Sequence, residues 1–156
     1  MDLCGLKWSV WTLFAFFIVQ IYWISETGSS TLDFPKTILE IHSKGQRYHF
    51  LVEIAGNQEQ RRKGLMHRTI IPINTGMLFV FDRQTSIQMW MKNTPISLDM
   101  IFADIDMTIV SIARETKPFS TQIIRSIGPA KYVLEVRAGT ASRLKLSVGD
   151  KLSWRQ

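Results

Sequence analysis

Short runs in which apolar and polar residues alternate constrain the fold of this chain more than any other feature. Because successive side chains of a β-strand point to opposite faces of a sheet, each such run predicts a strand. About eight strands are predicted, at Leu39–Ile41, Tyr48–Ile54, Met77–Phe81, Ile87–Met91, Leu98–Phe102, Ile109–Ala113, Tyr132–Val136 and Lys151–Trp154. Met77–Phe81 is apolar on both faces, which predicts a central strand. The close spacing of these strands predicts one mainly β domain, a sandwich of the jelly-roll type or a barrel-like fold, and not an array of βαβ units.

Two short helices are expected among these strands. Asn57 is a good N-cap for a helix over Gln58–Lys63, and Gln60 stands three residues later, where a capping box requires it. Gly64 follows at the position where helices commonly end. A second helical turn or two is expected within Ala138–Leu144.

The N-terminal segment predicts that the domain is exported. Trp8 to Ile24 carries no charge over 17 residues, which lies between a secretory apolar region and a membrane span. Lys7 precedes the run, so the N-terminus is expected in the cytoplasm. The length favours an uncleaved anchor that contacts the membrane through residues 8–24. A cleaved signal peptide is the alternative, because Ser25–Ser30 is small and polar.

This organisation divides the chain into three parts. Residues 1–25 form the signal-anchor or signal peptide, residues 26–37 a polar linker, and residues 38–156 the β domain, placed in the cell envelope on the periplasmic or extracellular side. The only cysteine, Cys4, precedes the apolar run, so the exported part has neither a disulfide nor a thiolate site. The formal charge of +6 suits an anionic envelope partner, although solubility explains such a charge more often. No nucleic-acid partner is expected.

A group of polar residues interrupts the alternation and predicts a site. Trp90, Lys92 and Asn93 lie within five residues of Pro95, and Asp99 stands inside the next strand. An indole beside a cation, an amide and a carboxylate suits a polar ligand stacked on the ring, such as an envelope glycan. The structural alternative is that Asn93 satisfies turn backbone groups and that Asp99 pairs with a cation.

Five blocks of residues, in order, resemble a known family. They are Arg61-x-x-Gly64-Leu65-Met66-x-Arg68, Gly76–Phe81, Trp90–Thr94 with Leu98-Asp99, Val133–Glu135 with Ala138-Gly139, and Gly149-Asp150. Together they are similar to the family called domain of unknown function 192, over roughly residues 45–152. The resemblance implies a compact, mostly β domain of jelly-roll or sandwich type behind a signal or anchor segment, and it implies no activity. Gln60 replaces a common Glu of the family pattern, and Met107 and Lys145 each replace a Gly.

Two further charged residues belong to these blocks. Arg61 stands just before Gly64, and a guanidinium can hold a carboxylate bidentately, so Glu135 or Asp99 is a candidate partner. Glu135 lies in an apolar run, where a carboxylate either faces outward or is paired inside. We therefore expect a network of Arg61, Lys92, Asp99 and Glu135, which would hold the fold, bind a ligand or do both.

A non-catalytic binding or accessory module is the favoured function, with no cofactor. One alternative is an envelope hydrolase that uses Asp99 and Glu135, although adjacent cations would lower the pKa values of both carboxyls. Another is a copper-binding protein that uses the thioethers of Met89 and Met91 with His67. Methionine fills core gaps more often than it binds metal, so a metal site is the weakest of these hypotheses.

Trp90 separates a binding role from a packing role. In a strand, Trp90 faces away from its neighbours Met89 and Met91. If the methionines point inward, the indole is at least partly open to solvent and available to a ligand. If instead the indole belongs to the core, it cannot be a stacking platform.

Overall fold

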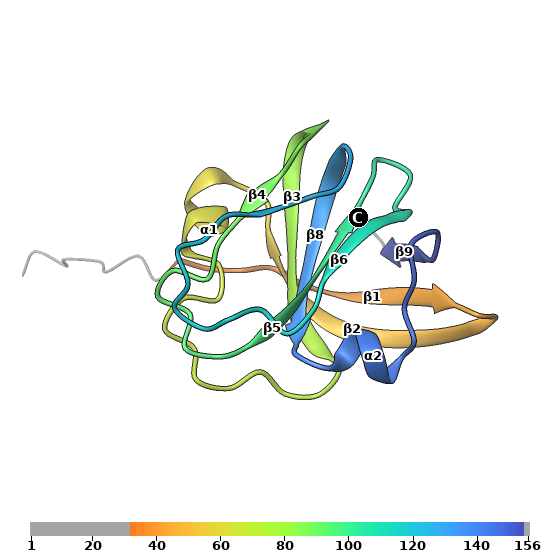
Figure 1. The fold of residues 1–156 in the computed structure, drawn as a ribbon, viewed down its shortest axis with the longest axis horizontal. Helices are drawn as coiled ribbons and strands as arrows, with labels where there is room; N and C mark the ends of the chain where they lie inside the picture. The colour runs from red at the N-terminus through yellow and green to blue at the C-terminus, as the bar shows by residue number, and fades with distance from the viewer. Residues whose placement is uncertain (1–31, 155–156) are drawn as a thin grey trace, which may run out of the picture. The chain divides into compact units, whose positions relative to one another are not determined.

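The computed structural model describes residues 32–154, so the predicted N-terminal segment and the first half of the linker, residues 26–31, lie outside the described residues. Within that range, no helix is both long enough and apolar enough to cross a membrane. The described residues form nine strands and two short helices (Figure 1). These are β1 (Lys36–Ser43), β2 (Gln46–Ala55), α1 (Gln58–Lys63), β3 (Thr75–Thr85), β4 (Gln88–Met89), β5 (Leu98–Ala103), β6 (Ile109–Ala113), β7 (Ile124–Arg125), β8 (Ala130–Arg137), α2 (Thr140–Arg143) and β9 (Lys151–Trp154).

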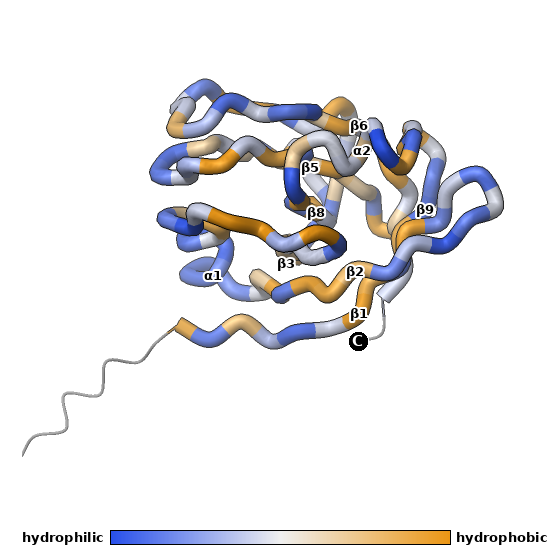
Figure 2. The backbone as a smooth tube through the Cα atoms, turned by 90° about the horizontal axis from the view of Figure 1, so that it is seen from below, coloured by the Kyte–Doolittle hydropathy of each residue, from blue (hydrophilic) through white to orange (hydrophobic). Residues whose placement is uncertain are grey.

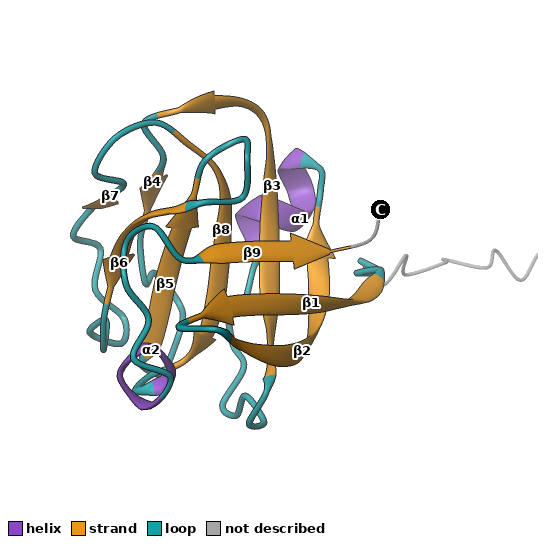
Figure 3. Cartoon of the chain, turned by 90° about the vertical axis from the view of Figure 1, so that its right-hand side faces the viewer, coloured by secondary structure: helices purple, strands orange, loops and turns teal. Residues whose placement is uncertain are grey.

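Seven of these strands form one curled sheet in the order β6-β5-β8-β3-β2-β1-β9, which gives a half-barrel and not a sandwich of two sheets. β9 lies beside β1 at one edge (Figure 3). The curl brings the β9 edge to the segment before β6, where Thr108 bridges Lys151. Two backbone hydrogen bonds reinforce this contact, from the Ile109 N–H to the Asp150 carbonyl at 2.8 Å and from the Leu152 N–H to the Met107 carbonyl at 2.8 Å. A mainly β, barrel-like fold with two short helices is therefore confirmed.

The sheet contains one parallel pair, which the sequence analysis did not predict. β2 and β3 run parallel, with Leu51 opposite Thr75 and Ala55 opposite Phe79. The other pairs within the sheet are antiparallel. Residues 56–74, which include α1, carry the chain back to the starting end of β2, as a parallel connection requires. The sheet is therefore not an array of βαβ units, but it contains this one parallel connection through α1.

The two faces of the sheet bury separate groups of apolar side chains. One group includes residues of β6 and β9, the two edge strands, so it fills the inside of the curl, together with α2. The other covers the opposite face of β3, β5 and β8, beneath the β4–β7 ribbon and the loop after α1. The hydropathy of the backbone follows this pattern, with hydrophobic segments along the strands and hydrophilic ones at the turns (Figure 2).

The eight predicted strands are present, but β7 was missed. Its two residues, Ile124 and Arg125, pair with Met89 and Gln88 of β4 and carry no alternating pattern long enough to recognise. α1 has the predicted bounds and the full capping box, in which the Asn57 side chain accepts a hydrogen bond from the Gln60 N–H at 2.8 Å. α2 falls inside the predicted Ala138–Leu144 range.

Asp99 of β5 is fully buried and holds α2 against the sheet. One carboxylate oxygen accepts a hydrogen bond from the Ala141 N–H at 2.7 Å, and the other accepts one from the Glu115 N–H at 2.8 Å. A carboxylate can accept both bonds because it carries no hydrogen of its own. The geometry thus supports a structural role for Asp99 and not a ligand-binding one. Its partners are backbone amides, however, and not the cation that was expected.

We expect Asp99→Asn to lower the free energy of unfolding by roughly 1–3 kcal/mol, because the amide NH₂ cannot accept from a buried N–H. Denaturant unfolding of the purified chain measures this loss. Asp106→Asn is the matched control, since Asp106 is exposed and such substitutions usually stay within about 0.5 kcal/mol. Equal losses in the two variants would show that Asp99 does not hold α2.

Candidate ligand pocket

A pocket with a volume of about 290 Å³ opens between α1, the outer face of β3 and β8, and the segment that follows β4. We call it the Trp90 pocket. Its lining comprises Gln58, Arg61, Arg62, Lys63, Gly64, Leu65, Met66, Phe79, Phe81, Gln88, Met89, Trp90, Lys92, Thr94 and Glu135. Four of the six predicted site residues are among them, namely Arg61, Trp90, Lys92 and Glu135.

Glu135 is the buried acid of the Trp90 pocket. In the sheet it stands between Met77 of β3 and Met100 of β5, both of which are fully buried. Glu135 itself is only 4% exposed. Among residues 32–154 its carboxyl has neither a hydrogen-bond partner nor an ion-pair partner. Burial raises the pKa of Glu135 from 4.5 to about 8, because the surroundings disfavour the charged form.

Two glycines of the family-like blocks allow this part of the pocket to form. A Cβ on Gly76 would lie 2.4 Å from the Glu135 carbonyl oxygen, so only glycine permits β3 and β8 to approach so closely here. Gly64 has φ of +45°, and a Cβ there would lie 3.0 Å from the Phe79 ring. Glycine therefore lets the chain turn out of α1 directly over the ring.

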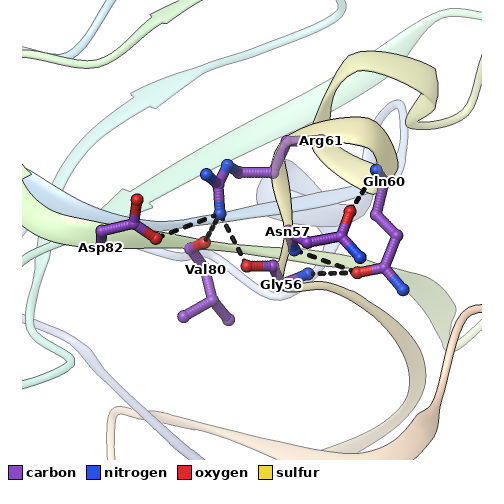
Figure 4. A network of polar contacts seen from close by, with 6 residues as sticks. All are labelled: Gly56, Asn57, Gln60, Arg61, Val80 and Asp82. Carbon is purple, nitrogen blue, oxygen red and sulfur yellow. Dashed lines mark hydrogen bonds and ion pairs between the residues drawn. The ribbon is translucent and has the colours of Figure 1, made fainter.

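Arg61 is fixed in the wall by oxygen atoms other than those predicted. Its Nη1 donates to the carbonyls of Gly56 at 2.7 Å and Val80 at 2.8 Å, and it lies 3.5 Å from Oδ1 of Asp82 (Figure 4). The guanidinium also lies over Phe81, 5.3 Å from the ring centroid. The expected pairing of Arg61 with Glu135 or Asp99 is not formed, because the end of β3 supplies a nearer carboxylate. The expected four-residue network is likewise not formed.

Trp90 and Lys92 line the pocket from the segment after β4. Trp90 is 43% exposed, as expected, while Met91 beside it is fully buried. Strand alternation does not explain this exposure, because β4 ends at Met89 and Met89 lines the same pocket as Trp90. The Lys92 ammonium lies 5.3 Å from the centroid of the Trp90 ring, within the range of a cation–π interaction. The pocket thus has aromatic walls, and the two cations beside them are already oriented.

The other two predicted residues do not line the Trp90 pocket. Asn93 adopts a left-handed turn with φ of 55°, and its carbonyl accepts a hydrogen bond from the His67 N–H at 2.7 Å. Asp99 lies opposite Val136 in the register, whereas Glu135 lies opposite Met100. Directly opposed residues share a face and sequence neighbours do not, so Asp99 and Glu135 are on opposite faces of the sheet.

The methionines of the metal hypothesis are separated. Met89 lines the pocket, but Met91 is buried, and its sulfur accepts a hydrogen bond from the Thr116 hydroxyl at 3.2 Å. Met66 lines the pocket beside His67, which is exposed. Within the described range, no group of three or more His, Cys, Asp and Glu side chains could hold a metal ion.

Sequence reasoning missed Phe81, Met66 and Met89 as pocket residues for a polar ligand. Phe81 was assigned to a central strand because Met77–Phe81 is apolar throughout. α1 and the β3 residues Phe79 and Phe81 line the same pocket, and the apolar pattern of Met77–Phe81 does not show which of its faces a helix covers.

Three departures from the family pattern have a structural explanation. Met107 and Lys145, which stand where the family has glycine, have φ of 61° and 54°, a conformation that glycine adopts most readily. Gln60 serves the helix cap, because its Oε1 accepts from the N–H groups of Gly56 at 2.9 Å and Asn57 at 3.1 Å. Gln60 does not line the pocket, so replacing a Glu there takes no carboxylate away from it.

Several known proteins are similar to this chain in sequence or fold over most of its length. A UPF0127 protein of Pyrococcus abyssi is 31% identical over 116 residues, which are 72% of this chain and 92% of that protein. A solved structure from Sinorhizobium meliloti 1021, whose name proposes a role as a transcription regulator, is 39% identical with a TM-score of 0.77, over 80% of this chain and 97% of that one.

A second solved structure, a protein of unknown function from Novosphingobium aromaticivorans DSM 12444, is 33% identical with a TM-score of 0.74, over 76% of this chain and 85% of that one. The model of the family described as "Uncharacterized ACR" matches residues 39–154. This chain therefore belongs to that family, the domain of unknown function 192.

Proposed function

We propose that this protein is a non-catalytic binding module that takes a small polar ligand in the Trp90 pocket. The observation that carries the proposal is Glu135, a buried carboxyl without a partner among the described residues, at the surface of an open pocket. The only fully enclosed side-chain polar atom without a partner among residues 32–154 is the hydroxyl of Ser43, so the oxygen atoms of Glu135 open onto the pocket. A ligand there would replace solvent as the hydrogen-bond partner that no described residue supplies.

The energetic argument points the same way. Burying a carboxyl without a partner lowers stability, and the fold could avoid this loss with an apolar residue, as it does at the neighbouring Met77 and Met100. Residues that weaken a fold without a structural benefit are typical of functional sites. Glu135 is therefore the residue of the predicted set that we most expect to contact the ligand.

A hydrolase is less well supported than a binding module. Two carboxylates that act together on one glycosidic bond must face the same cleft, about 5–10 Å apart. Glu135 and Asp99 lie on opposite faces of the sheet, and both oxygens of Asp99 accept hydrogen bonds from backbone N–H groups. We keep the envelope location as part of the proposal. It rests on the apolar N-terminal segment, which lies outside the described residues.

The name of the Sinorhizobium relative raises nucleic-acid binding as another function. Common DNA-binding motifs place a helix of several turns in the major groove. In residues 32–154 the two helices span only six and four residues. A small-molecule ligand is therefore the better proposal for the described domain.

A thermal-shift screen of the purified chain against sugars, wall fragments, small organic acids and metals tests the proposal, because a ligand of the folded state raises the melting temperature. We expect Trp90→Ala to abolish the shift of any ligand found. Trp90→Phe, which keeps a flat ring, should preserve part of it. A ligand whose shift is unchanged in both variants binds outside the pocket.

The same variant tests whether Trp90 is a packing residue. Because the ring is 43% exposed, Trp90→Ala should reduce stability by far less than the roughly 3–5 kcal/mol lost when a core aromatic is truncated. Phe102→Ala, at a ring that is 1% exposed, is the core control and should show the full loss. Denaturant unfolding compares the two, and similar losses would make Trp90 a core residue.

Glu135→Gln should change how stability depends on pH. Between pH 4.5 and about 8 the folded state keeps the Glu135 proton that the unfolded state releases, so the contribution of this group to stability falls as the pH rises across that range. Glutamine removes this fall. Melting temperatures at pH 5 and pH 8 should therefore show a larger gain for the variant at pH 8, and an equal gain at both would mean that Glu135 is ionised in the native protein.

A further inference from the structure

We infer that the ligand of the Trp90 pocket is a small organic anion. Its carboxylate or phosphate head is held by the basic residues of the pocket, and its largely apolar body places an uncharged polar group against Glu135. The inference rests on the proposed function, because it names the ligand class of the same pocket. It is carried by the charge of the lining, by the geometry of Arg61 and by the nature of the walls.

The charge of the lining favours an anion. α1 contributes Arg61, Arg62 and Lys63 to the lining, and the segment after β4 contributes Lys92. Glu135 is the only acidic residue of the lining, and β3 contributes no charged residue to it. Asp82, beyond the lining, has a side chain that is 85% exposed and screens Arg61 only weakly. Cations gathered around a concave site raise the local concentration of anions.

Arg61 is prepared to hold the acidic head. Its Nη1 is fixed by the carbonyls of Gly56 and Val80, and its plane is supported by Phe81. Its Nε and Nη2 have no hydrogen-bond partner among residues 32–154. A guanidinium presents its donors in a rigid fork that matches a carboxylate or a phosphate. Because Arg61 is already immobilised, little side-chain entropy is lost when the head binds.

The walls specify the rest of the ligand. Leu65, Met66, Phe79, Phe81, Met89 and Trp90 give the pocket apolar and aromatic sides. A sugar ring would leave most of its hydroxyl groups against these sides without partners, which costs free energy. A flat or apolar body that fits a volume of about 290 Å³ would not. The structure therefore narrows the expected polar ligand from a glycan to a small acid with an apolar body.

Glu135 specifies the far end of that body. A protonated carboxyl both donates and accepts hydrogen bonds, so it suits a hydroxyl, carbonyl or amide group. A second negative charge on the ligand would meet an acidic group in apolar surroundings and is disfavoured. A cation, whether an amine or a soft metal ion beside Met66 and Met89, would be attracted by an ionised Glu135 but repelled by the four cations of the lining.

This arrangement couples ligand binding to the protonation of Glu135. Burial already raises its pKa to about 8, and a bound anion nearby raises the pKa further. Affinity for an anion should therefore be greatest below about pH 7 and fall as the pH rises through 8. The other charged groups that face the pocket are the arginines and lysines named above. For a cationic ligand the sign reverses, and affinity rises with pH.

Calorimetric titration of the full-length protein with three probes of similar shape tests which ligand charge the pocket prefers. The probes are 4-hydroxyphenylacetate, its amide, and tyramine, with inorganic phosphate and Cu(I) as separate titrations. We expect the acid to bind at least tenfold more tightly than the amide at pH 6.5, with tyramine weaker still. Its affinity should fall severalfold between pH 7 and pH 9, and it should weaken with added salt.

Three variants test which residues cause the preference for the acid and its dependence on pH. Lys92→Gln should weaken binding of the acid several-fold and leave binding of the amide nearly unchanged. Lys131→Gln is the matched control, because the Lys131 ammonium also lies over an aromatic ring, that of Tyr132 at 5.8 Å, but does not line the pocket. It should change neither affinity. Glu135→Gln should bind the acid at pH 7 and lose the fall in affinity at pH 9.

The outcomes separate this inference from the proposed function. Tightest binding of tyramine or of Cu(I), lost in Trp90→Ala, would overturn the inference and leave a binding pocket in place. Binding of phosphate as tight as that of the acid would contradict the inference that the ligand has an apolar body. Absence of binding by every probe at millimolar concentration would count against the inference and the proposed function together. Acid-selective binding that Lys131→Gln also weakens would place the site elsewhere.

Discussion

The close pairing of β8 with β3 is the contact on which the sheet and the pocket both depend. Gly76 lets the two backbones approach at the point where Glu135 stands, and any larger residue there would meet the Glu135 carbonyl. β8 also pairs with β5 on its other side, so it lies near the middle of the curled sheet. A side chain on the outer face of β8 at this point is enclosed by neighbours on both strands. The same backbone contact thus sets the register, the burial of Glu135 and its raised pKa.

The charged residues of the chain divide into those that hold the fold and those that remain available. Asp99 accepts hydrogen bonds from two backbone N–H groups and joins α2 to β5. Arg61 joins α1 to the end of β3 with one of its nitrogens and still lines the pocket with the rest of its guanidinium. Glu135 joins nothing within the described residues. All three residues occur in the blocks that resemble the family. Their occurrence in these motifs therefore did not show that Asp99 is structural and Glu135 is free, whereas their hydrogen-bond partners do.

Local patterns in the sequence predicted local structure well. Alternating or wholly apolar runs located eight strands, and Asn57 with Gln60 located α1. The parallel β2–β3 pair was missed because the direction of pairing depends on the path of residues 56–74, which alternation does not encode. Four of the six predicted site residues line one pocket. Asp99 was misplaced because β5 is buried on both faces, so no period of two in its sequence reveals which face the carboxylate occupies.

The position of Glu135 also explains why the fold does not neutralise this acid internally. The partner expected for it was Arg61, whose Nη1 is committed to two carbonyls that close the turn before α1 onto β3. Moving the guanidinium to Glu135 would leave those carbonyls without their donor and detach the helix from the sheet. Protonation lets the group be buried without any movement of the backbone. A carboxyl that is neutral for this reason can gain or lose its proton when a charged ligand binds in the pocket. This change of protonation requires no rearrangement of the fold.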